Sequence, residues 1–119
     1  MAVSVGIWGQ AVSVTEEDVH SALDYLRNSA HALGAATERE KRAEHMIKVQ
    51  EGFGYQSAEG ASEFRKAQAR TSERYIEAVE EHAKAYGESR KLYALREAAS
   101  AVIESWRTQQ ATLRHATKL

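Results

Sequence analysis

The histidines are the first residues to test for chemistry, because a neutral imidazole can bind metals and move protons near neutral pH. They stand at positions 20, 31, 45, 82 and 115. Glu17 and His20 have the spacing of a helical di-iron ligand pair, which requires a second Glu-x-x-His on another helix. None of the other four histidines has a glutamate three residues before it. The sequence therefore predicts no metal site and no cofactor, with the histidines on solvated helix faces.

Covalent catalysis has no better support. The chain has no cysteine, and no serine stands in a glycine-flanked nucleophile elbow. Its seven glycines form neither a phosphate-binding loop nor a dinucleotide fingerprint. The acidic residues follow the pattern of surface charges on helices. We expect a protein that is not an enzyme and has no catalytic residues.

Basic residues in the second half of the chain support a nucleic-acid hypothesis. The candidates for phosphate contacts are Lys66, Arg70, Arg74, Arg90 and Lys91. Tyrosines and a tryptophan are interleaved with basic residues over this half of the chain, and aromatic rings beside basic side chains can stack on single-stranded bases. Lys66, Arg70 and Arg74 recur every four residues as a basic stripe, but glutamates interrupt it, and the aromatic spacing also fits a helix core. The net charge of -1 does not by itself indicate what kind of partner the chain binds.

The elements that carry these residues are predicted to be helices. Proline is absent, alanine is abundant, and no apolar run approaches the length of a bilayer span, so we expect no membrane segment. Thr15 followed by Asp18 predicts a helix start with a capping box. That first helix has an apolar face and meets no stop before Gly52. The segment Gly52-Phe-Gly-Tyr-Gln is predicted to be the one clear loop.

The rest of the chain is predicted to continue as helix. Ser57 is expected to cap a second helix, and Thr71-Ser72 marks a restart. The last quarter has an apolar heptad seam of the kind by which one helix packs along another. Its members are Leu92, Leu95, Ala99, Val102, Trp106 and Leu113. Because the seam shifts phase from Tyr75/Val79/Tyr86, we expect a continuous helix with a local irregularity near Gly87, and the alternative is a true break there.

Residues 1–14 differ from the rest, because small and β-branched residues alternate there as in a strand. We expect this arm to pack on the helices or to pair with another chain; the alternative is a remnant of expression. The predicted fold is all-α: antiparallel long helices in a coiled-coil-like hairpin or three-helix arrangement, with a short strand-like arm. Residues 15–119 are expected to form one helical domain. Since a thin hairpin covers little apolar surface, we also expect a homo-oligomer, with a dimer favoured.

Three segments together resemble a group of short bacteriophage proteins: ALDYLRNSA (22–30), RTSERY (70–75) and above all LREAASAVIESWRTQQATLR (95–114). Those relatives share a leading Leu-Arg-x-x-Ala helix and a closing Ile-Glu-x-Trp-Arg-Thr-like string. The resemblance covers residues 15–116 loosely and is specific only near the C-terminus. It implies a setting among phage recombination and single-strand DNA metabolism genes, in the cytoplasm of an infected bacterium, without an assigned activity.

The signature residues of that resemblance are the candidates for interaction. Trp106 lies on the apolar seam, so we expect it to be buried, whereas Glu104, Arg107 and Arg114 point off the seam. Those three could pair across an interface or touch phosphate, and the alternative is packing plus a favourable basic charge at the helix C-terminus. The expected function is contact with a protein partner in phage DNA recombination or replication, and single-stranded nucleic acid is the alternative partner.

A rival interpretation comes from the expected shape. A cysteine-free chain with two long helices also resembles small secreted helical-hairpin proteins that carry Trp-x-Gly at the turn. Here the expected turn is Glu51-Gly-Phe-Gly-Tyr, without tryptophan, and Trp8-Gly9 lies in the arm instead.

Overall fold

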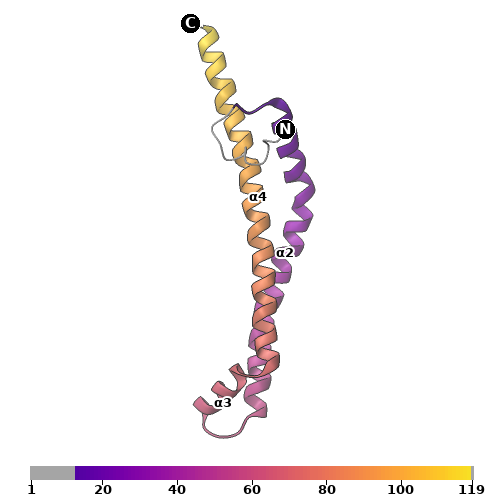
Figure 1. Cartoon of the computed structure of the whole chain (residues 1–119), viewed down its shortest axis with the longest axis vertical. Coiled ribbons are helices and arrows are strands. Elements are labelled where there is room, and N and C mark those ends of the chain that lie inside the picture. Colours follow the sequence, from indigo (N-terminus) through magenta and orange to yellow (C-terminus); the bar gives the residue numbers. More distant parts are fainter. Residues whose placement is uncertain (1–12, 119) are drawn as a thin grey trace. The chain divides into compact units, whose positions relative to one another are not determined.

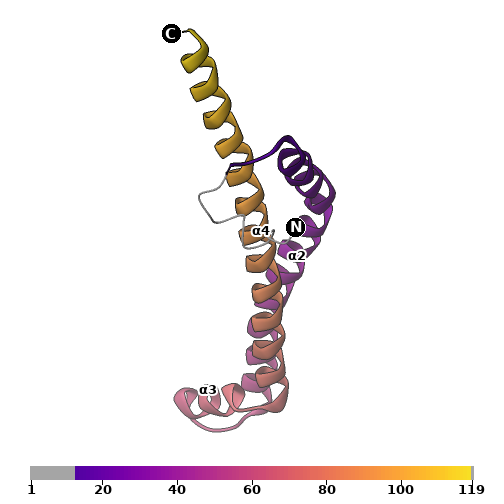
Figure 2. The ribbon, with the colours of Figure 1, turned by 45° about the horizontal axis from the view of Figure 1, so that its top comes forward.

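The computed structural model describes residues 13–118, and within them it is all-α. Three helices follow one another: α2 (Glu16–Ser57), α3 (Ser62–Arg70) and α4 (Glu73–Lys118). Residues 13–32 with 92–118 form one compact unit, and residues 33–91 form a second. In each unit a stretch of α2 runs antiparallel to a stretch of α4 (Figures 1 and 2). The predicted fold class is therefore confirmed, while the strand-like arm falls almost entirely outside the described residues.

The start of α2 is the predicted capping box. The Asp18 N–H donates to the Thr15 hydroxyl at 3.1 Å, and the Thr15 N–H donates to the Asp18 carboxylate at 2.9 Å. Two backbone donors that the helix leaves unpaired are thus satisfied reciprocally. Glu16 and Glu17 add acidic charge to the first turn, where the helix dipole favours it.

Replacing Thr15 by alanine removes the acceptor of this cap. We expect a loss of about 1 kcal/mol in the free energy of unfolding, which thermal denaturation followed by circular dichroism would measure. Ser21→Ala, at an exposed position inside α2, is the control and is expected to be neutral or slightly stabilising. Equal effects of the two substitutions would contradict a capping role for Thr15.

The prediction of a loop at Gly52–Gln56 is wrong, because α2 continues through both glycines and ends at Ser57. The reason lies in packing rather than in turn geometry. A Cβ on Gly54 would lie 2.9 Å from the Cα of Ala69 in α3, so Gly54 provides a close approach of two helices. The turn falls later, at residues 58–61, where Gly60 adopts a φ of 110° that favours glycine.

The second predicted helix start is also displaced. α3 begins at Ser62 after Ala61, not at Ser57. The predicted restart at Thr71-Ser72 is confirmed: α4 begins at Glu73, and the Ser72 hydroxyl accepts the Tyr75 N–H at 3.2 Å. From there α4 runs without a break through Gly87 to Lys118.

A regular heptad line along each long helix is buried or half-buried throughout. On α2 it comprises Val19, Ala22, Leu26, Ser29, Leu33, Ala36, Glu40, Ala43, Ile47, Gln50 and Gly54. On α4 it comprises Tyr75, Ala78, His82, Ala85, Ser89, Leu92, Arg96, Ala99, Ile103, Trp106 and Gln110. We call these lines the α2 seam and the α4 seam. Small residues recur in both, which favours a close approach of the helix axes.

The α4 seam contains Leu92, Ala99 and Trp106 as predicted, and the predicted Val102 is buried beside it, but the rest of the line differs from the prediction. It keeps one phase through Gly87, and it does not use Val79, Tyr86, Leu95 or Leu113, which are exposed. The phase shift in the sequence arises because these large apolar residues lie beside the buried line, while the line itself contains Ser89, His82 and Arg96.

In the unit of residues 13–32 and 92–118, the core is a small cluster around Ala22, Ala99 and Val102. Half-buried Val14, Tyr25, Leu26 and Ile103 pack against it. The side chain of Gln109 binds the backbone just before the start of α2. It donates to the Val14 carbonyl at 2.9 Å and accepts the Val14 N–H at 3.1 Å. Beyond it, residues 111–118 of α4 are all exposed.

Candidate interaction surfaces

The signature residues near the C-terminus separate into two groups. Trp106 lies in the α4 seam and is half-buried, so the expected burial is partial. Glu104 and Arg107 lie off the seam and form an exposed ion pair, with a guanidinium nitrogen 2.8 Å from a carboxylate oxygen. Arg114 stands apart from that pair on the fully exposed last stretch of α4, beside exposed Leu113.

Two of the five candidate phosphate contacts already have carboxylate partners. On α3, Arg70 donates to Glu51 of α2 at 2.5 Å, and this hydrogen bond and charge raise the pKa of Arg70. On α4, Arg90 lies over the Tyr86 ring, 5.2 Å from its centroid, and 3.8 Å from Glu40. Each of these guanidinium groups would have to give up a carboxylate contact to bind phosphate fully.

The remaining basic candidates do not gather into one site. Lys66 is exposed on α3 and lines a hollow with Lys48 and Glu51 of α2. Lys91 is exposed on α4. The predicted basic stripe is therefore spread over two helices and mixed with acids.

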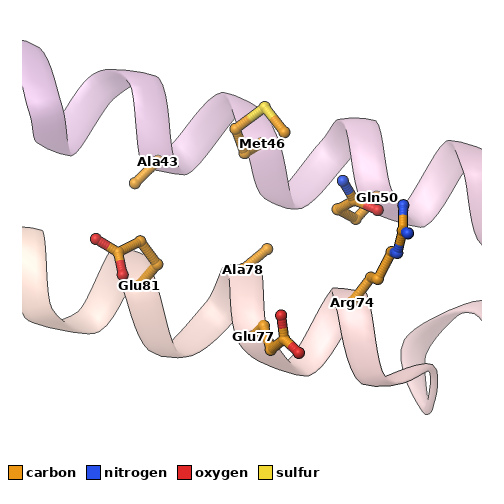
Figure 3. Close-up of a pocket in the computed structure, with 7 residues that line it drawn as sticks. All are labelled: Ala43, Met46, Gln50, Arg74, Glu77, Ala78 and Glu81. Carbon is orange, nitrogen blue, oxygen red and sulfur yellow. The ribbon is translucent and has the colours of Figure 1, made fainter.

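Arg74 lines an open hollow between α2 and α4 of about 530 Å³ (Figure 3). Its lining residues are Ala43, Met46, Gln50, Arg74, Glu77, Ala78 and Glu81. Figure 3 shows Ala43, Met46 and Gln50 on α2, with Arg74, Glu77 and Glu81 on the facing stretch of α4. A cation and two carboxylates thus share one shallow surface, which suits neither an isolated phosphate nor a buried acid–base pair.

Polar groups inside the seams hold the helices in register. In the unit of residues 33–91, the Ser89 hydroxyl, fully buried, donates to Glu40 at 2.5 Å. In the other unit, Arg96 donates to the Leu26 carbonyl and to the Ser29 hydroxyl, each at 2.7 Å. Buried polar contacts of this kind penalise a shifted helix pairing, because a shift leaves them unsatisfied.

His82 departs from the expectation that every histidine is solvated. Its Nε2 atom is buried without a hydrogen-bond partner, and its ring lies 6.3 Å from that of Tyr86. The signal that could have placed it is its position in the α4 seam, between Ala78 and Ala85 at heptad spacing.

One apolar surface was missed because two of its residues, Val79 and Tyr86, were expected to belong to the apolar seam. Ile76, Val79, Ala83 and Tyr86 each follow an α4 seam position, share its heptad spacing, and are exposed. The three large ones have 47%, 40% and 48% of their surface exposed. We call these four residues the α4 row. An exposed apolar line with 3-4 spacing is the pattern by which a helix receives another helix.

A row of alternating charge accompanies it on α2. Lys41, Glu44, Lys48 and Glu51 each follow an α2 seam position, and we call them the α2 charged row. In an antiparallel pair, residues that follow the seam on both helices lie on one side of the pair, and residues that precede it lie on the other. Arg39 and Glu88, which precede seam positions, meet at 2.6 Å and fit this geometry. The α4 row and the α2 charged row therefore share one side of the unit.

In residues 13–118, no group of three or more His, Asp or Glu side chains could hold a metal ion. None of the three helices is both long enough and apolar enough to cross a bilayer. In comparisons with known proteins, no family model, no curated protein and no solved structure matches this chain.

Proposed function

We propose that this chain is a non-enzymatic bacteriophage accessory protein that acts by protein–protein contacts in phage DNA recombination or replication, inside the infected bacterium. The observation that supports contact with protein is the α4 row, an exposed apolar line with coiled-coil spacing on a helix that is already paired along another face. The resemblance of residues 95–114 to the closing helix of short phage proteins supports the setting.

The C-terminal stretch of α4 supports the same function. Residues 111–118 extend as fully exposed helix, so Leu113 and Arg114 stand on a bare surface. Leu113 offers an apolar anchor with 54% of its surface exposed, and Arg114 offers a charge beside it. Arginine is enriched in protein interfaces, and an exposed apolar side chain beside it gains from burial in one.

Single-stranded DNA is the second candidate partner, and exposed tyrosines beside basic residues favour it. Tyr86 and Tyr93 are 48% and 41% exposed, and Arg90 and Lys91 stand between them on α4. Aromatic stacking could hold bases there. Protein contact is the better supported function, because Arg70, Arg90 and Arg107 already lie against carboxylates.

A salt-dependent titration separates the two partners. Labelled single-stranded DNA would be titrated at low and moderate salt with the native chain and with the Arg107→Glu and Arg114→Glu variants. We expect no binding even at low salt, because the basic residues do not form one continuous site. Binding that weakens steeply with salt, by roughly 0.7 log units in affinity per phosphate contact and per log unit of salt, and that the reversals abolish, would instead establish the nucleic-acid function.

Recovery of the partner tests the protein function directly. The tagged native chain would be purified from phage-infected cells and its bound proteins identified by mass spectrometry, with Leu113→Lys/Arg114→Glu as the surface variant. We expect a phage recombination or replication protein that the variant loses. Recovery of this chain alone, or of the same proteins with both forms, would contradict the proposal.

A further inference from the structure

We propose that a hollow between α2 and α3 binds an acidic segment of the partner protein that carries an apolar side chain between its carboxylates. We call this surface the α2–α3 hollow. Its volume is about 400 Å³, and its lining residues are Lys48, Glu51, Gly52, Tyr55, Gln56 and Lys66. This inference rests on the proposed function, since it names the chemistry by which the partner is recognised.

The two helices that form the hollow are joined by specific contacts. The Arg65 guanidinium of α3 lies over the Tyr55 ring, 4.1 Å from its centroid, and donates to the Tyr55 carbonyl at 3.0 and 3.2 Å. The Tyr55 hydroxyl donates to the Ser62 hydroxyl at 3.2 Å, and α3 approaches Gly54 of α2 closely. These contacts fix α3, and with it Lys66, so the walls of the hollow are preformed. A preformed site loses less conformational entropy when it binds a ligand.

The hollow presents two positive charges that the described residues do not neutralise. Lys48 of α2 and Lys66 of α3 are exposed, and neither has an ion-pair or hydrogen-bond partner among residues 13–118. The carboxylate among the lining residues, that of Glu51, is held by Arg70 instead. Two ammonium groups on neighbouring helices therefore attract a ligand that has two anionic groups.

The rest of the lining is mostly apolar. Gly52 leaves the surface of α2 bare, because a Cβ there would meet nothing within 4 Å. Tyr55 stands three residues further along α2, so its ring borders the same stretch of helix surface. A phenylalanine side chain of the ligand can lose its contact with water on this surface while carboxylates on either side of it reach the lysines.

These observations favour a protein segment over single-stranded DNA. Single strands are held by a continuous basic groove and by aromatic faces on which successive bases stack. In the hollow, Arg65 already covers one face of the Tyr55 ring, and Arg70 is paired with Glu51. Two separate ammonium groups beside an apolar surface suit two carboxylates of an apolar peptide better than a string of phosphates.

Fluorescence anisotropy with a labelled peptide tests the charge requirement. The probe has one phenylalanine between two pairs of aspartates, and the whole native chain is titrated into it. We expect saturable binding at low salt that weakens as salt rises. Lys48→Glu and Lys66→Glu should each weaken binding about tenfold or more, because the new carboxylate repels the probe. Lys84→Glu is the matched control: it makes the same change in net charge at an exposed position of α4 outside the hollow, and binding should stay within about twofold of native.

Filling the hollow tests the apolar requirement separately. Gly52→Leu places a side chain on the bare surface, so it should weaken binding of the probe about tenfold or more. Replacing the phenylalanine of the probe by alanine should weaken its binding to the native chain similarly, with little further loss in Gly52→Leu. Gly34→Leu is the matched control, because Gly34 also lies in α2, outside the hollow, and a Cβ there meets nothing within 4 Å. It should leave the affinity unchanged. Circular dichroism would verify that both variants remain helical, as the better helix propensity of leucine predicts.

Three outcomes would overturn the proposal: no binding of the probe at low salt, equal losses in the control variants, or tighter binding of a thymidine oligonucleotide of the same net charge that depends on Lys48 and Lys66. A chain that recovers a recombination or replication protein from infected cells but does not bind the probe would overturn this inference alone. Binding of the probe without any such partner would overturn the proposed function and leave the acid-binding hollow standing.

Discussion

Replacing Ala99 by glutamate is expected to destabilise the protein by at least about 3 kcal/mol, because it places an unpaired carboxylate in a dry seam. Ala99 has 0% of its surface exposed and belongs to the cluster with Ala22 and Val102. The loss is a large share of the roughly 5 to 15 kcal/mol by which domains are stable. Urea denaturation followed by circular dichroism would measure it.

Ala101→Glu is the matched control, because Ala101 is exposed two residues further along the same helix. It introduces the same charge and the same helix propensity without burial. We expect a change within about 0.5 kcal/mol for this variant. Similar losses at positions 99 and 101 would show that the α4 seam does not run where the structure places it.

Adding one methyl group at Gly54 is expected to destabilise the protein, and adding it at Gly52 is expected to stabilise it. Both glycines lie inside α2, where alanine is the better helix former by about 1 kcal/mol. A Cβ at Gly52 meets nothing within 4 Å, so Gly52→Ala should gain up to that amount. A Cβ at Gly54 would lie 2.9 Å from the Cα of Ala69 and force α3 away, for a net loss of about 1 to 3 kcal/mol.

Thermal denaturation would show the opposite signs, and hydrogen exchange would show where the loss falls. In Gly54→Ala the amides of α3 should exchange faster, while those of residues 16–32 in the other unit should be unchanged. A stabilising effect of Gly54→Ala would mean that α3 does not pack on α2 at this position.

The sequence was sufficient to predict the helical class and several helix ends. Thr15 and Asp18 formed the predicted cap because such a box depends only on residues three apart. The restart at Thr71-Ser72 had the same local basis. The glycines at 52 and 54 led to the wrong prediction of a loop. The role of Gly54 depends on Ala69, which is distant in sequence and close only after folding.

Leu92, Ala99 and Trp106 were predicted correctly, but the rest of the seam was mispredicted, for a physical reason that also hid the interaction surface. Hydrophobic periodicity selects the largest apolar residues, and on α4 these include Val79, Tyr86 and Leu95. The helices instead approach through Ala85, Ser89 and other small or polar residues, whose burial carries little hydrophobic signal. The large residues next to this line are left outside. The seam could have been located from its unbroken heptad spacing, which continues through the polar residues His82 and Arg96.

The candidate site was predicted less well than the fold. The sequence correctly placed Glu104 and Arg107 off the seam, but which basic residues face carboxylates, as Arg70 faces Glu51 and Arg90 faces Glu40, depends on pairing between helices. Such pairing cannot be derived until the register is known.

Cross-linking from the α4 row tests most directly the claim that this row contacts a partner protein. In infected cells, a photoreactive residue in place of Val79 should cross-link a phage recombination or replication protein. The same residue in place of Met46, which is 39% exposed on the other side of the helix pair, should not. Cross-linking of the same proteins from both positions, or of no protein from position 79, would contradict the account.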